Sequence, residues 1–156
     1  MLQYQKKVGK KMNYTIEEFD KAKTKVMNYI MYKKRTEYEV KNKFSKTLEE
    51  NLLNDIIEYV KEAGYLSDEN YIERAVAEYM AIKNLSQKEI SYKLYSKGID
   101  KNLIEDYFSS HREELEEYEL KSATAIFTKK INTMEEEEIK NYLRKKGYRE
   151  DIINEI

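Results

Sequence analysis

The sequence predicts an all-α fold, in which three tandem three-helix repeats form an elongated, curved body. Pro is absent and Gly occurs only four times among the 156 residues, so the punctuation typical of strands and hairpins is missing. Apolar residues recur instead at helical spacing. The same apolar pattern returns at intervals of about fifty residues, which is typical of a helical repeat protein.

Three sets of matching apolar residues define the repeat. The sets are Val26, Val76 and Ile126; Val40, Ile90 and Ile139; and the pairs Leu52-Leu53, Leu103-Ile104 and Ile152-Ile153. Gly98 and Gly147 also match, and each stands where the second helix of its repeat should stop. Because the members of a set occupy the same place in successive repeats, we expect Val40, Ile90 and Ile139 to be core residues.

Helix starts are marked by capping boxes, in which a hydroxyl and a carboxyl reciprocally satisfy free backbone N–H groups. The pairs with this spacing are Thr15/Glu18, Thr36/Glu39, Thr47/Glu50, Ser86/Glu89 and Thr133/Glu136. With the glycines at 64, 98 and 147 as helix stops, each repeat is predicted to contain three helices. The predicted helices span 20–33, 36–46 and 49–63, then 68–83, 86–97 and 100–112, then 113–130, 134–146 and 149–156.

These helices divide the chain into predicted domains. Residues 1–19 form an N-terminal tail and helix start, and the three repeats follow as repeat 1 (20–66), repeat 2 (67–112) and repeat 3 (113–156). A unit of this size buries little apolar area alone, so neighbouring repeats should stack. Stacked repeats of this kind present extended surfaces, which suit large partners better than small substrates.

Composition limits the classes of function. The formal net charge is −1, so the chain has no global attraction for nucleic acid, and any contact with phosphates needs a local patch. The absence of Cys excludes disulfides, thiolate nucleophiles and Cys-based metal sites. Residues 1–12 are basic but lack the apolar core of a signal peptide, and no apolar run reaches membrane-spanning length. We therefore expect a cytoplasmic protein without a membrane partner.

Candidate catalytic groups are few. His111 is the only histidine, and we expect a solvated residue near a helix end, where a cation complements the dipole. Glutamates at 113, 114, 116, 117 and 135–138 are expected on exposed faces. The sequence contains no Glu-x-x-His pair for a di-metal site and no Gly-rich phosphate loop. We predict no catalytic residue, no cofactor and no metal.

Several lysines recur in register with the repeat. Lys33 corresponds to Lys83 and Lys43 to Lys93, while Lys46, Lys97 and Lys146 are each predicted to end the second helix of a repeat. The structural interpretation is that they complement the dipole at helix C-termini. The functional interpretation is a periodic basic ridge that meets acidic or phosphate groups on a periodic partner. These seven lysines are the predicted partner-binding residues.

Tyrosines cluster in NYIMYKK (28–34) and YKLYSK (92–97). Their rings could stack on single-stranded bases. We favour the structural interpretation, in which Tyr at helical spacing belongs to the core or to its rim.

Three short motifs resemble the RecX family. RTEYEV (35–40) resembles the Arg-Ser/Thr-x-x-Glu-Leu opening of the family's second helix, and GYLSDENYI (64–72) resembles its Gly-Tyr-Leu-Asp-Asp element between repeats 1 and 2. LYSKGI (94–99) resembles its Leu-x-x-Lys-Gly-Ile turn. The order and spacing of the motifs match the family from about residue 15 to residue 156.

The resemblance implies a regulator with no chemistry of its own. Such proteins bind the RecA recombinase and its filament on single-stranded DNA, and they mostly lower its ATP hydrolysis and strand exchange in recombination, DNA repair and the SOS response. We expect a monomer, and a weak direct contact with DNA stays open. Two alternatives remain, a helix-turn-helix-like DNA-binding repeat and an enzyme that uses carboxylate, Lys or Tyr chemistry.

Overall fold

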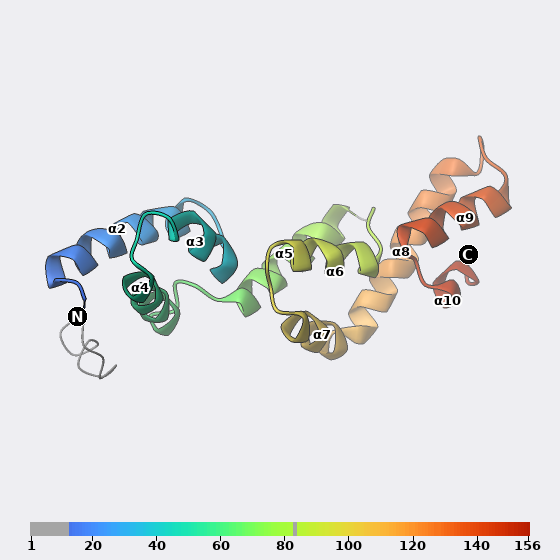
Figure 1. Ribbon diagram of the computed structural model, residues 1–156. Coiled ribbons are helices and arrows are strands. Elements are labelled where there is room, and N and C mark those ends of the chain that lie inside the picture. The colour runs from blue at the N-terminus through green and yellow to red at the C-terminus, as the bar shows by residue number, and fades with distance from the viewer. Residues whose placement is uncertain (1–12, 83) are drawn as a thin grey trace. The chain divides into compact units, whose positions relative to one another are not determined.

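The computed structural model describes residues 13–82 and 84–156, and these residues form α-helices and no strand (Figure 1). The helices are α2 (Ile16–Tyr32), α3 (Glu37–Phe44), α4 (Glu50–Glu62), α5 (Asp68–Ile82), α6 (Gln87–Ser96), α7 (Lys101–Ser110), α8 (Arg112–Lys130), α9 (Glu136–Lys146) and α10 (Glu150–Ile153). Over the described residues the all-α prediction is confirmed. The helices follow one another in the predicted order, three to each predicted repeat.

Helix boundaries agree with the prediction to within a few residues. The largest difference at a helix start is in α2, which begins at Ile16 rather than at residue 20, because the Thr15 side chain accepts the N–H of Glu18. Part of the predicted N-terminal tail, residues 1–12, lies outside the described residues. The elongated overall shape stays a prediction.

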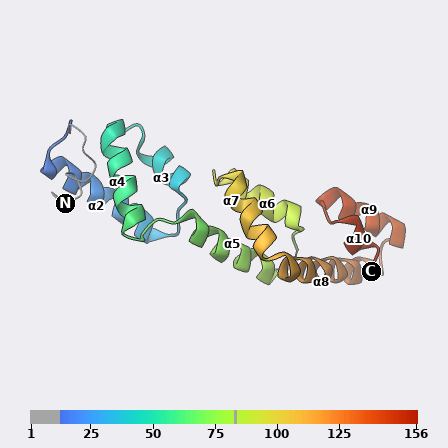
Figure 2. The same cartoon turned by 90° about the horizontal axis from the view of Figure 1, so that it is seen from below.

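Contacts within the chain divide it into two compact units, with the division between Tyr71 and Ile72. In the first unit α2, α3 and α4 pack around one apolar core, and Figure 2 shows α4 beside α2 (blue). Phe19, Val26 and Val40 are fully buried in that core. Val40 therefore has the core role that the repeat pattern predicts.

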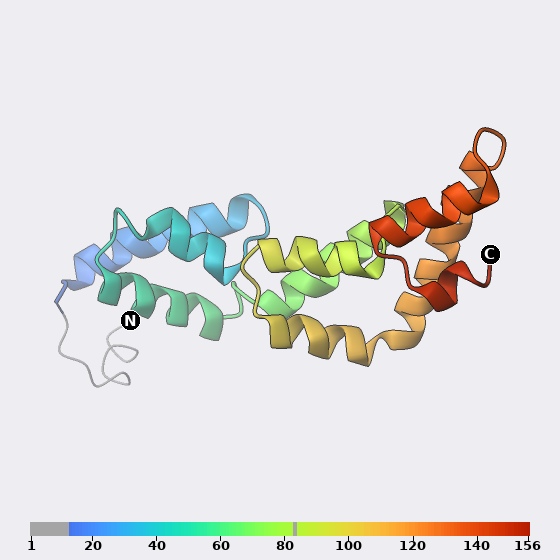
Figure 3. The ribbon, with the colours of Figure 1, turned by 45° about the vertical axis from the view of Figure 1, so that its right-hand side comes forward.

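The second unit contains most of α5 together with α6 to α10 (Figure 3). Its C-terminal core is formed by α8, α9 and α10, which contact one another. Ile90 of α6 and Ile139 of α9 are fully buried, as their shared repeat position predicts. Ile126, the repeat equivalent of Val26, is only partly buried and packs against the C-terminal core.

Three glycines end helices in the left-handed conformation, as predicted. The φ angles of Gly64, Gly98 and Gly147 are +82°, +78° and +94°. Gly147 also makes a close approach, since a Cβ at this position would lie 2.9 Å from the Cδ of Lys88 on α6. The end of α9 and the start of α6 are thus in direct contact within the second unit.

Two of the five predicted capping boxes are complete, those of Thr36/Glu39 and Ser86/Glu89. The predictions that Thr47 and Thr133 begin capping boxes were wrong. Each of these hydroxyls donates to a carbonyl of the preceding helix, and the N-cap is the glutamate two residues further on. Glu49 caps α4 through its own carboxylate, which accepts two backbone N–H groups.

None of the helices in the described part of the chain combines the length and the apolar composition that crossing a bilayer requires.

Candidate partner-binding surface

Two of the candidate lysines lie over tyrosine rings within their own repeat. The ammonium of Lys43 on α3 lies 5.8 Å from the ring centroid of Tyr29 on α2, and that of Lys93 on α6 lies 5.8 Å from Tyr79 on α5. Both lysines are exposed. At this distance a cation is attracted by the ring face, so the same contact joins the first and second helices of repeats 1 and 2.

Repeat 3 makes a similar contact, with the lysine on its first helix and the tyrosine on its second. Tyr142 on α9 stands where repeats 1 and 2 have lysine, and the ammonium of Lys130 on α8 lies 4.4 Å from its ring centroid. These contacts explain why Lys43 and Lys93 occupy the same position in their repeats, even if neither lysine binds another protein. They leave the outer side of both lysines open to solvent, so both remain available for a contact.

The other candidates lie near helix ends. Lys33 is the exposed C-cap residue of α2, and Lys97 is the partly buried C-cap residue of α6. The expectation that Lys46 ends a helix was wrong, because α3 stops at Phe44 and Lys46 lies exposed in the following turn. Lys83 lies outside the described residues.

Lys146, the last residue of α9, is engaged within the protein. Its ammonium lies 3.6 Å from the carboxylate of Glu89 on α6, and its side chain is 23% exposed. Its backbone carbonyl accepts the hydroxyl of Ser86 at 2.7 Å. Lys146 therefore joins repeats 2 and 3, in addition to any role in binding a partner.

Carboxylates from the following repeat cap the second helix of repeats 1 and 2. The Glu37 N–H at the start of α3 donates to Asp68 at 2.9 Å, and Glu37 itself pairs with Lys61 at 3.1 Å. At the matching place in repeat 2, the Gln87 N–H donates to Glu119 at 3.3 Å and the Gln87 side-chain amide donates at 2.8 Å. A carboxylate at a helix N-terminus complements the dipole and satisfies free N–H groups.

Burial opposes ionisation of both capping carboxylates. Desolvation raises the pKa of Glu119, and the hydrogen bonds from Gln87 only partly offset this effect. Desolvation likewise raises the pKa of Asp68, against the hydrogen bond from the Glu37 N–H. We interpret both carboxylates as structural, because each accepts the backbone N–H at the start of a helix in the preceding repeat.

We expect Glu119→Ala to lower the free energy of unfolding by about 1–3 kcal/mol, because it leaves the partly buried Gln87 N–H without its acceptor. Denaturant unfolding followed by circular dichroism measures the loss. Glu117→Ala on the same helix is the matched control, since Glu117 is exposed and should change stability by less than about 0.5 kcal/mol. Equal effects of the two substitutions would contradict the capping role.

His111 and the acidic run of α8 have structural surroundings. His111 links α7 to α8, and its Nδ1 lies 2.9 Å from the carbonyl of Tyr107, on whose ring the imidazole stacks. Glu116 is not a free surface group, because it pairs with Arg112 at 3.0 Å and with Arg149 at 2.9 Å. Within residues 13–82 and 84–156, no cluster of His, Asp and Glu side chains could hold a metal ion.

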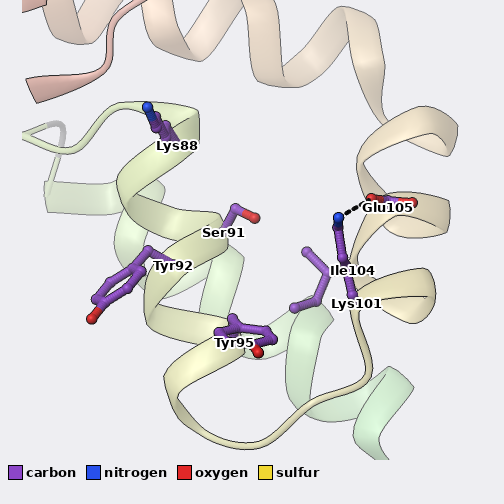
Figure 4. A pocket seen from close by; sticks show the side chains of 7 residues that line it. All are labelled: Lys88, Ser91, Tyr92, Tyr95, Lys101, Ile104 and Glu105. Carbon is purple, nitrogen blue, oxygen red and sulfur yellow. Dashed lines mark ion pairs between the residues drawn. The ribbon is translucent and has the colours of Figure 1, made fainter.

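A groove of about 420 Å³ lies between α6 and α7 (Figure 4). It is lined by Lys88, Ser91, Tyr92 and Tyr95 from α6 and by Lys101, Ile104 and Glu105 from α7. Ile104 is buried and gives the groove an apolar floor, while Lys101 and Glu105 form an exposed ion pair at 3.7 Å.

Sequence reasoning did not assign this groove. The packing interpretation of the tyrosines holds for Tyr29, which is partly buried against the first core. It was wrong for Tyr92 and Tyr95, which are 71% and 61% exposed. The sequence feature that could have pointed to the groove is that the other repeats lack these two tyrosines. Residues needed for packing should recur in every repeat, so tyrosines found in one repeat alone indicate another role.

Several known proteins are similar to this chain, although no family model matches it. The regulatory protein RecX of Finegoldia magna is 35% identical over 152 residues, which cover 90% of this chain and 72% of that protein. The regulatory protein RecX of Staphylococcus carnosus is 30% identical over 133 residues, which cover 83% of this chain and 50% of that protein.

A solved structure agrees with these relatives. The crystal structure of RecX from Lactobacillus salivarius superposes with a TM-score of 0.76 at 27% identity, and the match covers 90% of this chain and 95% of that one. The fold and the sequence similarity both extend over nearly the whole chain. The chain therefore belongs to the RecX family of regulatory proteins.

Proposed function

We propose that this protein binds RecA and its filament on single-stranded DNA, and that it regulates the filament by contact alone, without being an enzyme. The observation that carries the proposal is the similarity to regulatory RecX proteins over 90% of the chain. In this proposal regulation mostly means inhibition of ATP hydrolysis and of strand exchange.

The repeat architecture supports binding to a periodic partner. A helical filament offers the same surface at regular intervals, and successive repeats can engage successive copies of that surface. Lys43 in repeat 1 and Lys93 in repeat 2 are exposed at matching positions, so each can contact one copy of that surface. Each exposed ion pair contributes only about 0–1 kcal/mol, so the effect depends on several contacts held together by one chain.

Binding to the assembled filament tests the proposal. RecA from the same source is assembled on an immobilised oligonucleotide with a non-hydrolysable ATP analogue, and association of this protein is followed by biolayer interferometry. We expect saturable binding that is much tighter than binding to the same oligonucleotide without RecA. Equal binding to bare and RecA-coated DNA would contradict the proposal and favour a DNA-binding repeat protein.

A further inference from the structure

The groove between α6 and α7 presents two aromatic rings to solvent. Tyr92 and Tyr95 lie three residues apart on α6, and their exposed fractions are 71% and 61%. Figure 4 shows Tyr95 between the two helices, on the side of Ile104. Exposed tyrosines beside an apolar floor offer ring faces and hydroxyl groups to a ligand at little cost in conformational entropy.

The other repeats lack these tyrosines, so the repeat scaffold does not require them. The residues in place of Tyr92 are Asn42 and Asn141, and those in place of Tyr95 are Ser45 and Arg144. In repeat 3, Arg144 reaches across and donates to Glu150 at 2.9 Å, where repeat 2 has Lys101. A charged bridge thus spans the corresponding place in repeat 3, whereas in repeat 2 it is a groove lined by aromatic residues.

Lysines stand on both helices that form the groove. Lys88 comes from α6, and its aliphatic stem lies so close to Gly147 that a Cβ there would be 2.9 Å from Lys88 Cδ. Lys101 comes from α7, and its partner Glu105 is exposed, so an arriving phosphate can replace that ion pair at little cost. The groove therefore combines ring faces with two cations.

We propose that this groove binds single-stranded nucleic acid, with bases stacked on Tyr92 and Tyr95 and backbone phosphates paired with Lys88 and Lys101. Aromatic faces next to basic side chains are the combination that single strands require. A duplex does not fit this combination, because its bases are already stacked and its binding needs a broad basic surface. The inference goes beyond the proposed function, since such binding does not require RecA.

Fluorescence anisotropy with a labelled oligothymidine and the full chain tests the inference. We expect the Tyr92→Ala/Tyr95→Ala variant to bind at least about fivefold more weakly than the parent, because each stacked base is lost with its ring. Tyr92→Phe/Tyr95→Phe keeps both rings and should bind like the parent. The control Tyr38→Ala/Tyr65→Ala removes two half-exposed rings elsewhere and should also leave binding unchanged. Thermal melts check that every variant is folded.

The remaining outcomes are decisive in either direction. A parent that does not bind oligothymidine, or that binds an abasic oligonucleotide equally well, overturns the inference. The same holds if Tyr92→Ala/Tyr95→Ala binds oligothymidine normally but no longer binds the RecA filament, because the groove then takes a protein segment. If the chain has no affinity for RecA but its oligothymidine binding depends on both tyrosines, the proposed function fails and this inference stands.

Discussion

Ile90→Ala is expected to lower the free energy of unfolding of the second unit by about 2–5 kcal/mol. Ile90 lies on the inner face of α6 and is fully buried. Truncation removes three methyl or methylene groups from a packed core and leaves a cavity that the surrounding helices fill only in part. Because the chain forms two compact units, the loss should be read from the transition that involves residues 72–156.

The matched control is the same substitution at an exposed isoleucine. Ile82→Ala, at the end of α5, should change the free energy of unfolding by less than about 0.5 kcal/mol, since Ile82 is 63% exposed. Guanidinium unfolding of both variants, followed by circular dichroism, gives the comparison. If Ile90→Ala unfolded like Ile82→Ala, the helix phase derived from the repeat would be wrong.

Reversing the charge of Lys46, Lys97 and Lys146 together is expected to weaken inhibition of RecA about tenfold or more, with a smaller salt dependence of binding. The reason is that several weak contacts made by one chain reinforce one another through effective concentration. The dipole interpretation predicts a different result, a modest loss of stability with unchanged binding. Measurement of inhibition and of thermal stability on the same preparations separates the two interpretations.

The surroundings of the three lysines decide how the result for the triple variant is interpreted. Lys146→Glu places a carboxylate opposite Glu89, so part of any loss at this position reflects the junction between repeats 2 and 3. Lys46→Glu alone has no such complication, because Lys46 lies exposed in a turn. Charge reversal of Lys21, Lys25 and Lys129, all exposed, gives a control with the same change in net charge. Equal inhibition by the parent and the folded triple variant would show that the three lysines it replaces do not bind the partner, and the contact surface would lie elsewhere.

Much of the fold could be predicted because the repeat supplies several copies of each signal. Val40, Ile90 and Ile139 share one position, and all three are fully buried. Helix ends were predicted well wherever glycine allows a positive φ, as at Gly64 and Gly147. These signals are local, so the sequence alone contains them.

Contacts between repeats could not be predicted in the same way. Glu119 stands in an acidic run whose other members are largely exposed, yet it is fully buried beneath Gln87. The capping role of Glu49 was missed because a threonine two residues earlier has the better-known spacing. Which carboxylate is buried depends on helix packing, and neither spacing nor composition reports it.

The candidate site was predicted only in part. The register of Lys43 and Lys93 is explained by their contacts with Tyr29 and Tyr79, which are distant in sequence but close in the fold. Recurrence of a lysine at matching repeat positions therefore indicates a contact within the repeat as well as a candidate binding residue. The groove beside Tyr92 is lined by tyrosines that occur in repeat 2 only, so residues that recur in all the repeats do not indicate it.

The ATPase activity of RecA on single-stranded DNA tests the central claim most directly. RecA from the same source is assayed at saturating ATP while this protein is titrated from substoichiometric amounts to excess, and the protein is also assayed alone. We expect ATP hydrolysis to slow at substoichiometric to equimolar ratios, and we expect no hydrolysis by the protein itself. An unchanged rate across the whole titration would contradict the account.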